Sequence, residues 1–368
     1  MRALTMGVEE EFLLVDRRDG TPVERGPAVL RAARRELGDQ VQAEFFTSQI
    51  EVGTEPASRT ADLRAELVRL RRTLAGVAGE AGCRIAATGT PLLPPDRPLR
   101  VVDSARYQRM VRLYPRAVGR YDGMVCGCHV HLGTLDRATA VVLADHMRPW
   151  LPTLQAMAGN SPFAQGRDTG YSSWRSVEFA RWPQVGPAPM LRSEATYERY
   201  ADRLVDAGVL LDRKMIYWYA RPSEHVPTLE IRVADVNADV DTVVLLAALV
   251  RGLGMTLLPE AERGDPPPEV PDRDMRQAHA WAAAHGLAGT GLDPLTGEEV
   301  PVLRLVDRLL DRAAPGLEAA GDLELAEELV RRLRTEGGGA ARQRAVYRRR
   351  GDLRNVVNAL AAATCRDG

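Results

Sequence analysis

The sequence predicts a globular fold that combines helices with a sheet whose concave face is charged. The chain has 368 residues, 45% hydrophobic and 27% charged, which is enough for one large core or about two domains. Strand-like and helix-like segments alternate along it without an obvious repeat. Four of the strand-like segments carry acidic, basic or imidazole groups on one face only. These observations exclude a disordered chain and favour a mixed fold.

The individual elements follow from local patterns. Residues 7–15 are strand-like and end at a turn signal over 16–20. Residues 60–81 repeat leucine and valine at helical spacing, and Gly82 then provides a stop. Further strands are expected at 47–51, 83–88, 124–132 and 228–233, and further helices at 138–158 and 322–334.

The longest apolar stretch, 243–258, predicts a buried core helix and not a membrane span. Arg251 interrupts it, and it is shorter than a membrane helix requires. Asp241 or Thr242 is the expected N-cap. The four cysteines are too few and too irregularly spaced for a disulfide scaffold, and no signal peptide is recognisable, so a reducing cytoplasm is expected.

The domain organisation is predicted from one proline-rich segment. Residues 264–274 contain prolines that cannot continue a helix, and the chain beyond about 275 is mainly helical. We expect residues 1–368 to form a single domain, with that helical region as a subdomain or an outer layer.

Charge excludes several classes of function. The 49 basic and 50 acidic residues nearly cancel, so no global field attracts nucleic acid or an anionic membrane. Lys214 is the only lysine, which excludes a Walker A phosphate loop and leaves one residue for any Schiff base. Any bound phosphate must therefore be met by arginine and metal ions.

The four one-sided strands predict a metal site. Period-two alternation places these pairs on one face: Glu9 with Glu11, Gln49 with Glu51, His129 with His131, and Glu230 with Arg232. A solvated face explains any one strand, but converging carboxylates repel one another unless cations lie between them. Hard oxygen ligands with one or two imidazoles favour Mg²⁺ or Mn²⁺. Zinc is disfavoured because Cys126 and Cys128 would project opposite to the histidines.

A polar segment, 160–175, is the third candidate feature. Its glycines and its density of polar residues are typical of a functional loop. Arg175 at its end could clamp a substrate carboxylate with its planar guanidinium, and so could Arg221. A surface ion pair is the alternative for either arginine.

At these residues the chain resembles the type-two glutamate-cysteine ligase family, also called carboxylate-amine ligases. The matching motifs, which cover nearly the whole chain, are GVEEEFLLVD at 7–16, Q-x-E-x-x-T at 49–54, CG-x-HVH-x-G at 126–133, NSPF…G-x-DTGY-x-S-x-R at 160–175, YW-x-x-RPS…PT-x-E-x-R-x-x-D at 217–235 and GGGA-x-RQR at 337–344. Six ordered motifs make a specific signal.

The resemblance implies an α+β fold related to glutamine synthetase, in which a curved antiparallel sheet forms a funnel flanked by helices. It also implies Mg²⁺ and ATP on the inner face. In such enzymes a carboxylate attacks the γ-phosphorus of ATP, and an amine displaces the resulting acyl phosphate to give an amide, with ADP and phosphate released. Glutamate is the favoured acid.

The resemblance carries roles onto single residues. The expected metal ligands are Glu9, Glu11, Glu51, His129 and Glu230. Arg232 is expected at the transferring phosphoryl group, and Arg175 at the acid, as the two catalytic arginines. Arg221, Tyr171 and Gln49 are the other expected substrate-binding residues. The roles of His131 and Trp218 stay open.

Two departures from the family pattern bear on the amine. Ala164 stands where relatives often carry an aromatic residue, and Trp174 replaces a more usual Tyr or Met. These changes put cysteine as the acceptor in doubt.

Three functions remain in competition. The leading one is an ATP-dependent ligase that makes a γ-glutamyl or similar amide. A metal-dependent amidohydrolase is the second, because Glu and His clusters also activate water. The third is a non-catalytic nucleotide or metabolite sensor. The expected partners are small molecules, with a homo-oligomer as an open alternative.

Overall fold

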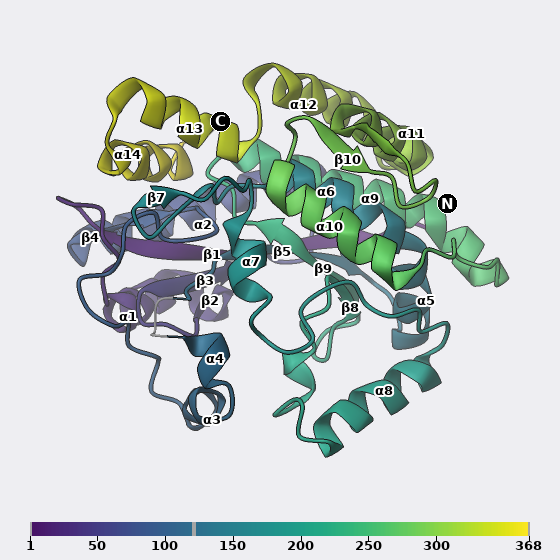
Figure 1. The fold of residues 1–368 in the computed structure, drawn as a ribbon, viewed down its shortest axis with the longest axis horizontal. Coiled ribbons are helices and arrows are strands. Elements are labelled where there is room, and N and C mark those ends of the chain that lie inside the picture. Colours follow the sequence, from purple (N-terminus) through teal and green to yellow (C-terminus); the bar gives the residue numbers. More distant parts are fainter. Residues whose placement is uncertain (1, 120–122, 367–368) are drawn as a thin grey trace.

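The computed structural model describes residues 2–119 and 123–366, and its centre is a seven-stranded antiparallel sheet (Figure 1). The strand order is β2-β3-β1-β5-β9-β8, with β4 also paired to β1. The strands are β1 (Thr5–Asp16), β2 (Val41–Ala43), β3 (Gln49–Gly53), β4 (Cys83–Ala86), β5 (Gly127–Gly133), β8 (Ala220–Pro222) and β9 (Thr228–Asp235). The α+β class and the antiparallel sheet are therefore confirmed.

Strand β1 sets the register of the predicted charged face. Glu9 pairs with His129 of β5, and Glu11 pairs with Glu51 of β3. Because side chains alternate along a strand, these groups lie on one face while Glu10 points to the other. Thr47 precedes β3, so its predicted place on that strand is wrong.

Helices cover the opposite face of the sheet. Helix α2 (Thr60–Glu80) contributes Arg71, which pairs with Glu10, and α9 (Val240–Arg263) packs on β1 and β5. Gly254 of α9 allows this approach, because a Cβ there would lie 2.3 Å from Leu132 Cδ2. Helix α9 is long and apolar enough to span a membrane, yet nearly all of it is buried in the protein, as expected of a core helix.

Two predictions about helices are wrong. The N-cap of α9 is Asp239, whose side chain accepts a hydrogen bond from the Asp241 amide. Residues 138–158 form α5 (Arg137–Met147), a 3₁₀ turn (Arg148–Trp150) and α6 (Leu151–Ala158), and not one helix. Pro149 and Pro152 lack the amide hydrogens that a continuous helix needs at this point.

The remaining elements surround the sheet. In Figure 1 the strands cross the middle of the molecule, α11 to α14 lie above them, and α3, α4 and α8 lie below. The helices not yet given are α1 (Gly26–Leu37), α3 (Ala105–Leu113), α4 (Pro115–Val118), α7 (Trp174–Phe179), α8 (Glu194–Asp206), α10 (Asp272–His285), α11 (Val302–Ala320), α12 (Leu323–Glu336), α13 (Gly339–Arg350) and α14 (Leu353–Thr364). Two hairpins, β6 (Phe163–Ala164) with β7 (Arg167–Asp168) and β10 (Thr290–Leu292) with β11 (Glu299–Pro301), complete the fold.

The proline-rich segment after α9 interrupts the helical structure, as the sequence predicts. Gly264 ends α9 in the left-handed conformation, and no helix or strand is formed over 265–271. Beyond this segment α11 and α12 pack along α9. The division into one domain with a helical layer stays a prediction.

Candidate active site

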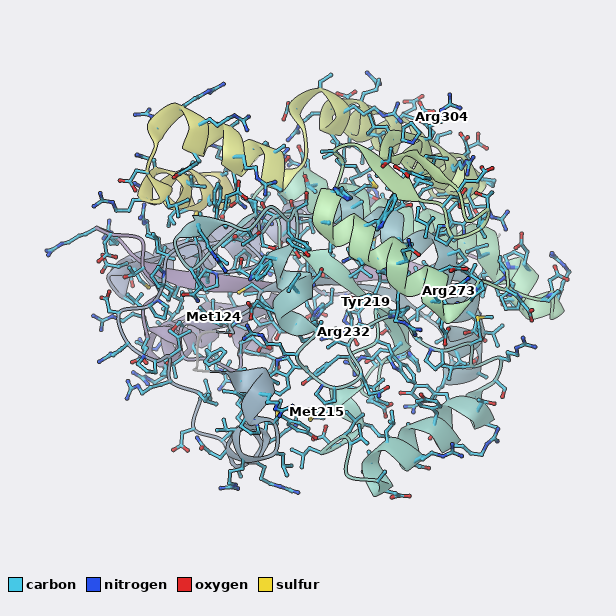
Figure 2. The ribbon with its side chains drawn as sticks, in the orientation of Figure 1. Met124, Met215, Tyr219, Arg232, Arg273 and Arg304 are labelled. Atoms are coloured by element: carbon cyan, nitrogen blue, oxygen red, sulfur yellow. The ribbon has the colours of Figure 1, made fainter. Side chains whose placement is uncertain are left out.

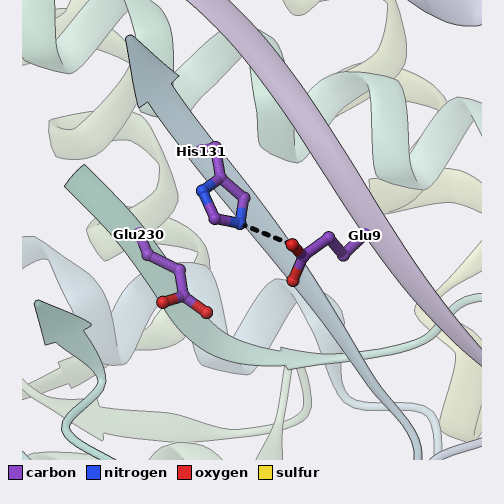
Figure 3. A group of neighbouring side chains, drawn as sticks. All are labelled: Glu9, His131 and Glu230. Carbon is purple, nitrogen blue, oxygen red and sulfur yellow. Dashed lines mark ion pairs between the residues drawn. The ribbon is translucent and has the colours of Figure 1, made fainter. Parts of the chain in front are cut away.

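Three strands bring the first group of potential metal ligands together. Glu9 of β1, His131 of β5 and Glu230 of β9 each offer a ligand atom within 4.8 Å of the others (Figure 3). His131 Nε2 lies 3.2 Å from Glu9 Oε1, and its Nδ1 lies 3.0 Å from Thr228 Oγ1. The contact with Thr228 orients the imidazole ring. Histidines that bind metals usually have their other ring nitrogen held by a hydrogen bond in this way.

A second group lies further along the same face. Glu11, Glu51 and Glu44 also place ligand atoms within 4.8 Å of one another. Glu44 was not predicted, because it follows the end of β2 on an irregular segment where strand alternation gives no direction. The sequence offered one signal for Glu44, its closeness to the motif at 49–51. Closeness in sequence does not determine toward which face of the sheet a side chain points.

His129 lies between the two groups. Its Nδ1 is 3.2 Å from Glu9 Oε2 and 3.7 Å from Glu230 Oε1, and its Nε2 is 3.8 Å from Glu11 Oε1. Burial and the nearby Arg232 lower the pKa of His129. A neutral imidazole at this position can donate a lone pair to a metal ion.

The pKa values of Glu51 and Glu230, one carboxylate from each group, are shifted in opposite directions. Burial raises the pKa of Glu51 well above its usual value, and neighbouring carboxylates raise it further. Burial would also raise the pKa of Glu230, but Arg221 and Arg232 outweigh it and hold that pKa well below its usual range. Negative charge at Glu51 therefore needs a cation that the protein itself does not provide.

Arg232 and Arg221 flank Glu230. Arg232 Nη1 donates to Glu230 Oε1 and lies 3.4 Å from His129 Nδ1. Arg221 Nε donates to Glu230 Oε2 over 2.8 Å, so this guanidinium is already engaged. Figure 2 shows Arg232 near the middle of the molecule, whereas Arg304 lies at its edge.

A cavity of about 190 Å³ opens beside the second group. Its cationic lining consists of Arg106, Arg175, Lys214 and Arg232, and its aromatic lining consists of Phe45, Phe46, Tyr107, Phe179, Trp182 and Tyr217. Arg106 is paired with Asp212. Such a cavity suits a small anion with an aliphatic body.

Arg175 is the notable cation of this cavity. Its side chain is 2% exposed, lies 5.3 Å over the Phe179 ring, and makes no ion pair with any residue in the described part of the chain. Gly127 makes room for it, because a Cβ there would lie 2.5 Å from Arg175 Nη2. A buried, unpaired guanidinium is costly unless a ligand completes it.

A second cavity, of about 730 Å³, lies next to the first group of potential metal ligands. Glu9 and His131 belong to its lining, together with apolar residues such as Pro56, Val226 and Pro227. No described residue that lines it is an arginine or a lysine. The two cavities thus differ in charge, and both are lined by residues of the same charged face, Glu11 and His129 in the smaller one and Glu9 and His131 in the larger one.

Two residues of the predicted substrate set, Gln49 and Tyr171, lie elsewhere or are already occupied. Gln49 lines the smaller cavity, but its Nε2 donates to Val125 O over 2.7 Å. Tyr171 packs edge to face against Trp174 and does not line either cavity. Trp218, whose role was open, packs in the core against Tyr200, and the adjacent Tyr217 lines the cavity instead.

The two departures from the family pattern also lie outside the cavities. Ala164 is buried in the β6–β7 hairpin, and Trp174 Nε1 donates to Glu178. Neither lines the smaller cavity. Their geometry therefore gives no support to a changed acceptor.

Asp235, at the end of β9, organises the polar segment 160–175. Its carboxylate accepts hydrogen bonds from the Asn160 amide, Ser161 Oγ and Ser173 Oγ over 2.7 to 2.8 Å. Burial raises the pKa of Asp235, with Arg175 acting against this. Its role was missed, because a single Asp at a strand end gives no signal of the loop that folds onto it.

Helix α13 fastens the same segment from the outside. Gln343 Nε2 donates to Asn160 O and Oδ1 over 2.8 Å, and Arg344 donates to Asp168 and to Tyr171 O. A Cβ at Gly339 would lie 2.3 Å from Asn160 Oδ1, so glycine is required for this approach. The glycine-rich motif at 337–344 therefore holds the segment 160–175 in place.

The cysteines are not members of the two carboxylate groups, although burial and the nearby Glu11 and Glu44 raise the pKa of Cys126. Cys128 points to the helix-covered face, beside Glu10 and Arg71, and burial raises its pKa well above the usual value. Neither of the metal-type groups found among the described residues contains a cysteine. The donors are therefore hard oxygens and imidazoles.

The sequence of the chain is similar to known proteins over its whole length. The model of glutamate-cysteine ligase family 2 matches residues 5–359. A Saccharopolyspora erythraea protein named glutamate–cysteine ligase 2-1 is 45% identical over 368 residues, which cover all of this chain and 96% of that protein. A Salinispora tropica protein named glutamate–cysteine ligase 2 is 44% identical, over 98% of this chain and 95% of the relative.

Solved structures share the fold at low sequence identity. The glutamate–cysteine ligase of Francisella tularensis, solved in complex with AMP, matches with a TM-score of 0.70 and 14% identity, over 99% of this chain and 89% of that one. A bifunctional glutathione synthetase from Pasteurella multocida matches with a TM-score of 0.69 and 17% identity, over 98% of this chain and 52% of that one. On the sequence matches, the chain belongs to glutamate-cysteine ligase family 2.

Proposed function

We propose that this protein is an ATP-dependent carboxylate–amine ligase that joins the γ-carboxyl of glutamate to an amine. The observation that carries the proposal is a single sheet face on which buried and partly buried carboxylates lie next to a cavity that contains Arg175, which makes no ion pair within the described residues. Membership of the family supports a ligase over the amidohydrolase and the sensor, because the relatives are named as ligases.

The carboxylates fit divalent cations. Glu9, His131 and Glu230 would hold one ion, and Glu11, Glu44 and Glu51 another, with His129 between them. The fit rests on donor chemistry and on repulsion, since burial and neighbouring carboxylates raise the pKa of Glu51 and a cation would favour its ionised form. Bound Mg²⁺ or Mn²⁺ would supply positive charge to phosphate oxygens.

Charge assigns the two substrates to the two cavities. The smaller cavity has cationic side chains and an aromatic wall, which suit the carboxylates and methylenes of glutamate. The larger cavity lacks cationic side chains among its described lining but has apolar residues, which suit an adenine ring. ATP in the larger cavity would direct its phosphates toward Glu9 and Glu230.

The chemistry then proceeds in two displacements. An oxygen of the glutamate carboxylate, held by Arg175, attacks the γ-phosphorus, and the bond to the bridging oxygen breaks to release ADP. Arg232, on the same face, stabilises the negative charge of the transferring phosphoryl group. The amine nitrogen then attacks the acyl carbon and loses a proton, and the carbon–oxygen bond breaks to release phosphate.

Cysteine is the acceptor that the names of the relatives suggest. We extend it to this chain as part of the proposal, since neither Ala164 nor Trp174 lines the cavity. The expected compartment is the cytoplasm, where the free thiols of the described cysteines stay reduced.

A screen of ADP release tests the proposal. Purified protein receives Mg²⁺, ATP and glutamate, with cysteine and a panel of other amines added one at a time. We expect ADP only when the acid and an accepted amine are both present. Amide hydrolysis without ATP would identify an amidohydrolase, and nucleotide binding without turnover would identify a sensor.

A further inference from the structure

A chain of five hydrogen-bonded side chains runs from α10 to the end of β9. His279 Nδ1 lies 2.5 Å from Gln155 Oε1, and Gln155 Nε2 donates to Ser176 Oγ over 2.8 Å. Ser176 Oγ lies 2.8 Å from Ser173 Oγ, which donates to Asp235 Oδ1 over 2.7 Å. His279, Gln155, Ser173 and Asp235 are nearly fully buried, and Ser176 in the middle of the chain is partly buried.

The carboxylate at the end fixes the direction of every bond in this chain. Asp235 can only accept, so the Ser173 hydroxyl must donate to it and must accept from Ser176. The Ser176 hydroxyl then accepts from the amide nitrogen of Gln155. This turns the Gln155 oxygen toward His279, whose Nδ1 must carry a proton. The chain therefore has one consistent arrangement of donors and acceptors.

His279 has the properties that this arrangement requires. Burial and the nearby Arg148 lower its pKa to about 3, so the imidazole is neutral and carries one proton. Its ring lies 4.5 Å from the ring of Tyr219, which holds it in place. The mechanism proposed above makes no use of this histidine.

The other end of the chain holds the backbone of Arg175. Ser173 is the N-cap of α7, in which Arg175 is the second residue. Asp235 also accepts from Ser161 Oγ, and this hydroxyl accepts from the Arg175 amide over 3.0 Å. The Arg175 guanidinium makes no ion pair within the described residues and is held directly only by a 3.4 Å hydrogen bond from Nη2 to Arg232 O and by the Phe179 ring, so the start of α7 contributes to its position.

We propose that His279 and Gln155 are positioning residues for Arg175, and that they control the binding of the acid substrate from outside the cavity. Neither side chain lines the cavity that contains Arg175. The inference rests on the proposed function, in which Arg175 binds the substrate carboxylate. Side chains of α6 and α10 would thereby act on the site, in addition to the bonds by which Ala283 O of α10 accepts from the Ser172 and Ser173 amides.

Two substitutions at one position test the inference. His279→Leu removes the donor at similar volume, and His279→Asn keeps an N–H near the place of Nδ1. We expect His279→Leu to raise the KM for glutamate about tenfold and to leave the KM for ATP within about twofold. His279→Asn should return the KM for glutamate to within about threefold of the wild type.

A matched control separates positioning from general destabilisation. His146 of α5 is equally buried and does not belong to the chain, so His146→Leu should lower the melting temperature without changing the KM for glutamate. Equal effects of His146→Leu and His279→Leu on that KM would overturn the inference. If His279→Leu does not fold, Gln155→Leu replaces it, with the same expected rise.

A measurement without substrate keeps the inference apart from the proposed function. Amide hydrogen exchange at Arg175 should be faster in His279→Leu than in the wild type, and His279→Asn should restore the slow rate. A wild-type enzyme that releases no ADP with any acid would overturn the proposed function. Unchanged exchange at Arg175 would overturn the positioning role, whatever the activity.

Discussion

Strand β1 carries glutamates on both of its faces, and their surroundings differ in charge. Glu10, on the helix-covered face, is fully buried, and Arg71 of α2 binds it through two hydrogen bonds of 2.5 and 2.9 Å. Glu9 and Glu11, its neighbours in sequence, meet histidines and other carboxylates on the opposite face. One face thus neutralises its charge within the protein, and the other leaves a deficit of positive charge that a metal ion can fill.

Removal of divalent cations should have the largest effect and should act on one face only. Exhaustive chelation is expected to abolish ADP release, since Glu11 and Glu51 then face each other without a cation, while the Arg71 side keeps the fold. Activity and far-ultraviolet circular dichroism are measured together. Full turnover in the chelated protein would falsify the metal site.

Arg232→Ala tests one of the two arginines that flank Glu230 on the charged face of the sheet. We expect kcat to fall by about three orders of magnitude, as for other arginines that stabilise a transferring phosphoryl group. Steady-state kinetics and a melting curve check the result. A folded variant that loses less than about tenfold in kcat would assign Arg232 to a structural role.

Arg71→Met tests the helix-covered face of the sheet, on which Arg71 pairs with Glu10. It leaves Glu10 buried without a partner, so the free energy of unfolding should fall by about 3 to 5 kcal/mol. Chemical denaturation measures this loss. The folded fraction should keep its Mg²⁺ affinity, and a large loss of that affinity would show that the two faces are not independent.

Arg175→Lys and Arg221→Lys compare the two candidate acid-binding arginines. Lysine keeps the charge but loses the planar fork, so the KM for glutamate should rise about tenfold in the first variant, with little change for ATP. Arg221 already binds Glu230, so its variant should affect glutamate less. The reverse pattern would transfer the role to Arg221.

The smallest expected effect is a release of protons when Mg²⁺ binds. The pKa of Glu51 is raised, mainly by burial, so the metal-free protein keeps a proton there that a cation displaces. Affinity for Mg²⁺ should therefore increase as the pH rises through this pKa. Calorimetry in two buffers of different ionisation enthalpy measures the release, expected to be about one proton or less per ion. Binding that is independent of pH would contradict the raised pKa.

Local pattern was enough to predict the charged face but not everything that completes it. Alternation along β1 and β5 placed Glu9, Glu11 and His129 correctly on one side, because a strand has a fixed period of two. Glu44 escaped, since its segment has no regular period. Asp235 escaped because its partners at 160–161 and 173 are distant in sequence.

The fold was predictable to a similar degree. The antiparallel sheet and the core helix α9 follow from periodicity and from family resemblance. The break between α5 and α6 was missed, although Pro149 and Pro152 carry the signal for it. The cavities depend on how loops cross the sheet, and such contacts have no local signature.

The attachment of α13 to the loop at Asn160 has a consequence for synthesis on the ribosome. All the carboxylates of the charged face are translated by residue 230, whereas Gln343 and Arg344, which fasten that loop, are translated later. A nascent or prematurely terminated chain therefore carries the complete set of charged side chains without a fastened loop beside Arg175. We expect catalytic competence to appear only after α13 has been translated and has folded onto the loop.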